Sequence, residues 1–105
     1  LENREPDLKV KYNAVPFAVA CKWRKSFGNG SISWAKDRQI KNYNDYQKTK
    51  KEKVYIALGV GGEAGKPEHL YLIPLSRLKY ETFKEDYVAD FEIKEDAEIL
   101  KFLQQ

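Results

Sequence analysis

The fold is decided by two stretches near the start of the chain, LKVKYN at residues 8–13 and FAVACKW at residues 17–23. The first alternates apolar and charged residues, which is the two-residue period of a half-buried strand. The second is almost unbroken apolar sequence until Lys22, as expected of a central strand that is buried on both faces. Asn13 and Pro16 bracket a short turn, so the two stretches predict an antiparallel hairpin.

After this hairpin the period of the sequence changes to that of a helix. Apolar and amide side chains recur at helical spacing from Gln39 to Gln47, which predicts a helix over residues 35–50. Its solvent face would carry Lys36, Arg38, Lys41 and Lys48. Strands are predicted at residues 53–60 and 69–74. A terminal amphipathic helix is predicted at 94–103, while residues 75–92 stay unassigned. This order predicts an α/β (α+β) fold in which helices flank a central mixed sheet.

Composition limits the classes of protein that the chain can represent. Its 105 residues predict one domain spanning positions 1–105. Cys21 and His69 are its only cysteine and histidine, which excludes an intrachain disulfide and the usual Cys/His zinc site. No apolar run approaches the roughly 20 residues of a transmembrane helix, so we expect no membrane partner and a cytoplasmic location. The start at Leu1 rather than at methionine suggests a piece of a longer protein.

A glycine-rich stretch, GVGGEAGK at residues 59–66, is similar to a phosphate-binding loop but departs from it. Val60 stands where that motif has its first glycine, and Lys66 is followed by Pro67 instead of serine or threonine. The dinucleotide-binding fingerprint fails as well, because a strand follows where a helix should start. We therefore predict a loop between two antiparallel strands and no small-molecule cofactor.

Charge is distributed unevenly along the chain. Residues 22–53 hold ten basic and three acidic residues, whereas residues 79–105 hold four basic and eight acidic ones. A basic segment of this density could bind a polyanion such as DNA. The alternative is that the lysines at 48–53 are only the solvated end of a helix, where positive charge suits the helix dipole.

A set of side chains suited to phosphodiester chemistry lies along these predicted elements. Asp7 opens the first strand, Lys22 ends the second, and Gln39 and Tyr43 lie one turn apart on the helix. A carboxylate can hold a divalent metal that polarises a phosphate, and a lysine beside it can offset developing negative charge. A hairpin would bring Asp7 and Lys22 to one edge of the sheet.

Pro6-Asp7, the hairpin and the FAVACKWR strand together resemble the PD-(D/E)XK nuclease superfamily, which has the restriction-endonuclease-like fold. The spacing Gln39-x-x-x-Tyr43 is similar to the QxxxY motif of its RecB-like branches. The resemblance covers residues 5–62 and implies a metal-dependent DNA nuclease that uses Mg²⁺ or Mn²⁺. It implies metal ligation by Asp7 and by the carbonyl of Cys21, a catalytic Lys22, and supporting roles for Gln39 and Tyr43. DNA would contact the basic side chains of Arg24, Lys25, Lys36, Arg38 and Lys41.

The sequence departs from this pattern at Ala20, where the family has a carboxylate two residues before the lysine. A methyl group cannot ligate a metal, so we expect weak metal binding and impaired cleavage. Three explanations stay open: a degenerate member that binds without cutting, a carboxylate that has migrated to Glu5 or Asp37, or an alanine introduced to silence a nuclease.

The start of the family core is also absent from this sequence. That core begins with a helix and a strand before the Pro-Asp motif. We expect a homo-oligomer partner or a missing N-terminal segment to supply these two elements. An alternative function is a non-catalytic module on the same fold, which binds nucleic acid or a protein. A protein-binding version could use the acidic tail with Trp23 and Trp34.

Overall fold

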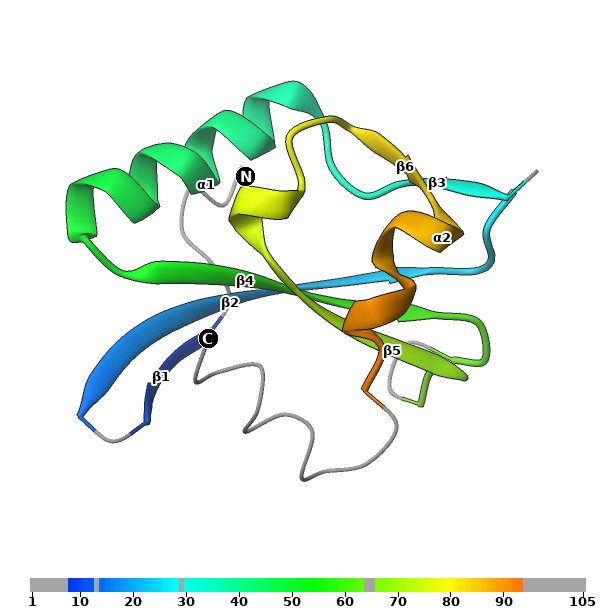
Figure 1. The fold of residues 1–105 in the computed structure, drawn as a ribbon, viewed down its shortest axis with the longest axis horizontal. Helices are drawn as coiled ribbons and strands as arrows, with labels where there is room; N and C mark the ends of the chain where they lie inside the picture. The colour runs from blue at the N-terminus through cyan, green and yellow to red at the C-terminus, as the bar shows by residue number, and fades with distance from the viewer. Residues whose placement is uncertain (1–7, 13, 29, 64–65, 94–105) are drawn as a thin grey trace.

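A computed structural model describes residues 8–12, 14–28, 30–63 and 66–93. Its centre is a four-stranded mixed sheet in the order β1-β2-β4-β5 (Figure 1). None of the helices within these described ranges combines the length and the apolar character needed to traverse a bilayer.

The first two strands form the expected antiparallel hairpin. β1 (Leu8–Tyr12) pairs with β2 (Val15–Arg24), and Tyr12 lies opposite Val15. The connection is therefore tighter than the sequence predicted, because Pro16 lies inside β2, opposite Lys11, instead of in the turn. Ala14 takes a left-handed backbone conformation with φ of 65°, which allows the chain to reverse within this short connection.

A helix carries the chain from β2 to the parallel strand β4 (Lys53–Val60). This is α1 (Asp37–Lys50), close to the predicted bounds, with Ile40, Tyr43 and Tyr46 on its buried side. Gln47, predicted to lie on the same stripe, accepts a hydrogen bond from the Val54 amide at 2.9 Å. Lys36, Arg38, Lys41 and Lys48 are exposed, as predicted.

The remaining strand of the large sheet is β5 (His69–Pro74), antiparallel to β4. Its bounds and those of β4 are the predicted ones. The glycine-rich stretch between them connects two antiparallel strands, as predicted, and a bridge joins Glu63 to Lys66.

Residues 75–92, which the sequence left unassigned, return over the side of the sheet that α1 covers (Figure 1). They contain η1 (Leu75–Arg77), β6 (Thr82–Lys84), α2 (Glu85–Val88) and η2 (Ala89–Phe91). β6 pairs with β3 (Ser31–Ser33) in a second small sheet, which sequence reasoning missed. The helix predicted at 94–103 lies outside the described residues.

The two faces of the sheet bury two separate clusters, which explains the unbroken apolar run of β2. Ala18 and Ala20 are fully buried in the cluster beneath α1, with Ile56, Leu58 and Ile73 of the neighbouring strands. Phe17 and Val19 point the other way, into a smaller cluster with Tyr55 and Leu72. Even-numbered positions of β2 therefore face α1, and Lys22 continues that row.

Candidate functional site

Lys22 lies near the end of β2, on the face of the sheet that α1 covers. Its side chain is half-buried, and its Nζ atom lies 5.3 Å from the centre of the Tyr43 ring. A cation at this distance is attracted by the electron-rich face of the ring, by about 0.5–2 kcal/mol depending on solvent exposure. The structure thus brings together Lys22 and Tyr43, two of the residues that the sequence singled out.

The ring of Tyr43 in turn packs against the ring of Trp34. The two rings stack with centres 6.2 Å apart and planes inclined by 20°, and both side chains are almost completely buried. The indole nitrogen of Trp34 donates a hydrogen bond to the carbonyl of Tyr80 at 2.7 Å. We refer to Lys22, Tyr43 and Trp34 as the Lys22 centre. Both rings are buried and packed against each other, so they restrict the positions that the Lys22 side chain can take.

Gln39 lies one turn before Tyr43 on α1 and is half-buried. Residues four apart on a helix lie on the same side, so its amide belongs to the same side of the helix as Tyr43. Asp37 lies on a different side of α1, because its position is about 200° around the helix axis from Gln39. Its side chain is exposed at the first turn of α1, which makes it a poor candidate for a migrated carboxylate.

The other predicted ligand positions offer no group of three ligands. Asp7 and Glu5 lie outside the described residues. Ala20 has no solvent exposure and packs in the apolar cluster beneath α1. The Cys21 side chain is exposed on the opposite face from Lys22, since adjacent strand residues alternate. Among residues 8–93 as described, no three histidine, cysteine, aspartate or glutamate side chains gather into a possible metal site.

The described residues around Lys22 therefore do not fit a divalent metal. They supply an ammonium, a phenol and an amide, whereas Mg²⁺ needs oxygen ligands that are usually carboxylates. What this arrangement can do chemically is donate hydrogen bonds from Lys22 to an anionic oxygen and offset its charge.

The predicted DNA-contacting residues occupy different environments. The Arg24 guanidinium donates hydrogen bonds to the carbonyls of Trp23, Ser33 and Trp34 at 2.8, 2.8 and 2.7 Å. It thereby fastens the end of β2 to the segment that leads into α1. Lys25, Lys36, Arg38 and Lys41 are exposed. Arg38 and Lys41, three residues apart, share the outer side of α1, away from its buried residues.

Sequence reasoning missed the contacts that support the site from residues 80–81. Besides the Trp34–Tyr80 hydrogen bond, the Trp34 amide donates to the Glu81 carbonyl at 2.9 Å. The Glu81 carboxylate accepts the Asp37 amide at 2.7 Å and so caps the start of α1. Lys36, at the N-cap position, makes no capping hydrogen bond with its side chain. The absence of a capping residue before Asp37 was the one local signal that the cap comes from elsewhere.

Comparison with known proteins identifies the fold. No protein-family model and no curated protein matches the sequence. A solved structure does match: Hjc, a Holliday junction resolvase from the archaeal hyperthermophile Archaeoglobus fulgidus. The TM-score is 0.68 with 15% sequence identity, over 93% of this chain and 75% of that one. The predicted resemblance is thus confirmed at the level of architecture: the chain has the restriction-endonuclease-like fold of the PD-(D/E)XK nucleases.

Proposed function

We propose that this chain is a nuclease-like domain that binds DNA and has lost, or nearly lost, phosphodiester hydrolysis. The observation that carries the proposal is Ala20. It lies two residues before Lys22 on the same face of β2, with no solvent exposure. An apolar methyl group in a packed cluster leaves neither a ligand atom nor room for a hydrated metal at that position.

The proposal keeps Asp7 as the remaining carboxylate of the motif and Cys21 as a carbonyl ligand, both by resemblance. A metal held by one carboxylate, one carbonyl and water would bind weakly, so no step of the function depends on it.

DNA binding is supported by the charge of the segment around the Lys22 centre. Lys25, Lys36, Arg38 and Lys41 are exposed cations close in sequence to the end of β2 and the start of α1. We assign to them the contacts with the phosphate backbone and to Arg24 a structural role. Contacts of this kind supply sequence-independent affinity that falls steeply with salt.

The test measures binding and cleavage of the same duplex DNA by the unmodified chain. We expect salt-dependent binding and no measurable cleavage in Mg²⁺ or Mn²⁺. Replacing both Lys36 and Lys41 by alanine should flatten the salt dependence by about 0.9 per lysine in the slope of log K against log salt. Lys11→Ala with Lys66→Ala removes two exposed charges from the edge strand and from the β4–β5 loop, and is the matched control.

Two results would contradict the proposal. Metal-dependent cleavage by the unmodified chain that Asp7→Ala abolishes would mean that another carboxylate completes the site. An equal loss of slope in the Lys11/Lys66 control would mean that Lys36 and Lys41 act only through net charge.

A further inference from the structure

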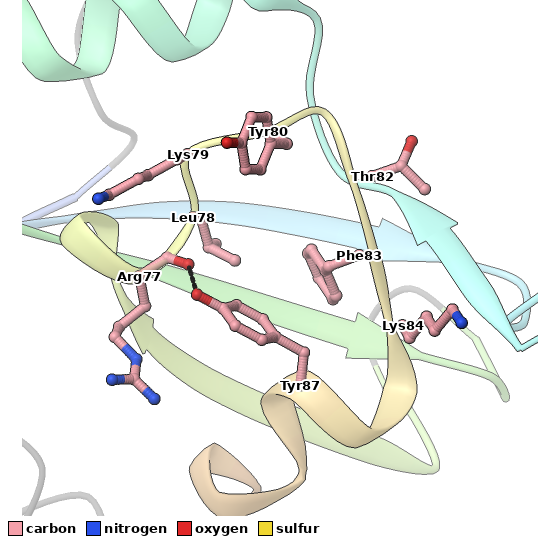
Figure 2. A pocket seen from close by; sticks show the side chains of 8 residues that line it. All are labelled: Arg77, Leu78, Lys79, Tyr80, Thr82, Phe83, Lys84 and Tyr87. Atoms are coloured by element: carbon pink, nitrogen blue, oxygen red, sulfur yellow. Dashed lines mark hydrogen bonds between the residues drawn. The ribbon is translucent and has the colours of Figure 1, made fainter.

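A concave site lies outside the Lys22 centre, on the part of the chain that the sequence left unassigned. It is a pocket of about 310 Å³ between η1, β6 and α2. Leu78 and Phe83, which are almost completely buried, form its floor. Tyr80 and Tyr87 stand at its sides with 77% and 49% of their surface exposed. Figure 2 shows their two rings on opposite sides of the space above Leu78 and Phe83.

The tyrosines are anchored even though they are exposed. The hydroxyl of Tyr87 donates a hydrogen bond to the carbonyl of Arg77 at 2.6 Å, and its ring lies 6.5 Å from that of Phe83. The carbonyl of Tyr80 accepts the indole hydrogen bond of Trp34. Exposed aromatic rings beside an apolar floor form a patch of apolar surface, and such patches commonly mark a binding site.

The charged residues that line the pocket all have the same sign. Arg77, Lys79 and Lys84 are among its lining residues, and no acidic residue is. In Figure 2 Arg77 and Lys79 extend on one side of the pocket and Lys84 on the other, so the cations flank the rings. Glu81, Glu85 and Asp86 lie in the same stretch of sequence but do not line the pocket, and Glu81 caps α1.

Aromatic side chains between cations are the composition of a site for unpaired nucleotides. The flat faces of bases stack on tyrosine rings without regard to sequence, and the flanking cations attract the phosphates on either side. In a duplex the faces of the bases are covered by neighbouring base pairs, so only an unpaired nucleotide can offer them. The volume is at the lower end of the range for small-ligand pockets, and suits one base better than several.

We infer that this pocket, with Tyr80 and Tyr87 as its stacking surfaces, binds the base of an unpaired nucleotide in a DNA strand. The inference rests on the proposed DNA-binding function and adds a preference for single-stranded or unpaired DNA. Trp34 connects the pocket to the Lys22 centre, because it stacks on Tyr43 and donates a hydrogen bond to the Tyr80 carbonyl.

The test compares binding of a single-stranded oligonucleotide, the duplex of the same sequence, and thymidine monophosphate. Loss of a stacking ring in Tyr80→Ala should weaken single-strand binding about tenfold and leave duplex binding within about twofold. Tyr80→Phe keeps the ring and is the matched control, which should bind like the unmodified chain. The salt slope for the single strand should not change in Tyr80→Ala but should fall by about 0.7 in Lys79→Ala.

The outcomes separate this inference from the proposed function. Duplex binding that depends on Lys36 and Lys41, with no single-strand loss in Tyr80→Ala, would overturn the inference and leave the proposed function in place. Absence of all DNA binding would overturn both. Thymidine monophosphate binding as tightly as the oligonucleotide would assign the pocket to free nucleotides and overturn the role of a strand.

Discussion

The Lys22 centre and the pocket formed by Tyr80 and Tyr87 are built from the same kinds of residue, aromatic rings and cations. They differ in exposure. In the Lys22 centre the rings of Trp34 and Tyr43 are buried and hold one lysine, whereas Tyr80 and Tyr87 of the pocket are 77% and 49% exposed. The guanidinium of Arg77 lies 5.9 Å from the centre of the Tyr87 ring, so this exposed ring contacts a charge as well as solvent. Exposure therefore indicates which aromatic cluster is support and which is a contact surface.

The largest expected effect comes from Trp34, which contacts both regions. Trp34→Ala removes a fully buried side chain and should lower the free energy of unfolding by about 3–5 kcal/mol. Trp34→Phe keeps a ring against Tyr43 but loses the hydrogen bond to Tyr80, and should cost far less. Urea unfolding measures the stability. If Trp34→Phe binds single-stranded DNA as tightly as the unmodified chain, the difference in exposure between the two regions still holds. The hydrogen bond from Trp34 would then not be needed for binding at the pocket.

The next prediction tests whether Ala20 accounts for the proposed loss of hydrolysis. Ala20→Glu inserts a carboxylate into a buried position and should cost about 3 kcal/mol of stability, through crowding and the penalty for burying charge. Mg²⁺ should restore part of that stability, together with cleavage, since residues 20 and 22 share a face. Thermal unfolding with and without Mg²⁺ gives the first readout, and nicking of plasmid DNA gives the second.

Ala18→Glu is the matched control for this experiment. Ala18 is also fully buried on the same face of β2, one residue pair further from Lys22. It should be destabilised similarly but gain nothing from Mg²⁺. An equal response of both variants to Mg²⁺ would show that the metal binds elsewhere, and that Ala20 is not the missing ligand position.

A smaller effect is expected at Glu81, which joins the segment bearing the pocket to α1. Glu81→Ala removes the carboxylate that accepts the Asp37 amide, and loss of such a cap costs about 1 kcal/mol. Hydrogen exchange should rise at the first turn of α1. Glu63→Ala, an exposed glutamate of the β4–β5 loop, is the control. Unchanged exchange in Glu81→Ala would mean that solvent replaces the cap.

The smallest effect is a dependence of stability on pH, at a pair of residues outside both regions. His69 on β5 lies 2.8 Å from a carboxylate oxygen of Glu92, which follows η2. The hydrogen bond to Glu92 raises the pKa of His69 above 6.5, and the charges of Glu92, Glu68 and Glu85 act in the same direction against some desolvation. A raised folded-state pKa means that the extra stability is present in full below pH 6.5 and is lost as pH rises through the folded pKa.

Because both side chains are partly exposed, this pair is worth at most about 0.5 kcal/mol. The stability difference between the unmodified chain and His69→Gln should be present at pH 5.5 and absent at pH 8.5. Urea unfolding at the two values measures it. A difference that persists at pH 8.5 would show that neutral His69 contributes by packing and not by charge.

The strands of the large sheet and α1 could be predicted from the sequence because their periods are local. β4 and β5 have their predicted bounds, and α1 lies within two residues of its own. The proximity of Lys22 and Tyr43 could also be predicted, since a motif on a hairpin and a helix implies that its residues lie close together. β3 and β6 could not be predicted, because a three-residue strand is too short to show a period. These two strands form by pairing with each other.

The pocket was missed for a related reason. Its residues lie within ten positions of one another, Arg77 to Tyr87, but the space between them arises from how η1, β6 and α2 turn back on the sheet. Alternation of tyrosines with lysines in that stretch was visible in the sequence, although the acidic balance of residues 79–105 concealed it. The net charge of residues 79–105 was therefore a poor guide, because the positions of individual lysines decide the charge at the pocket.

The contacts between residues 34–37 and residues 80–81 also bear on the order in which the chain can fold. The Asp37 amide finds its acceptor 44 residues later in the sequence, and the Trp34 indole finds its own 46 residues later. During synthesis the hairpin and most of α1 emerge well before these acceptors do. The cap on the first turn of α1 can therefore form only after the segment bearing Tyr80 and Glu81 has been synthesised.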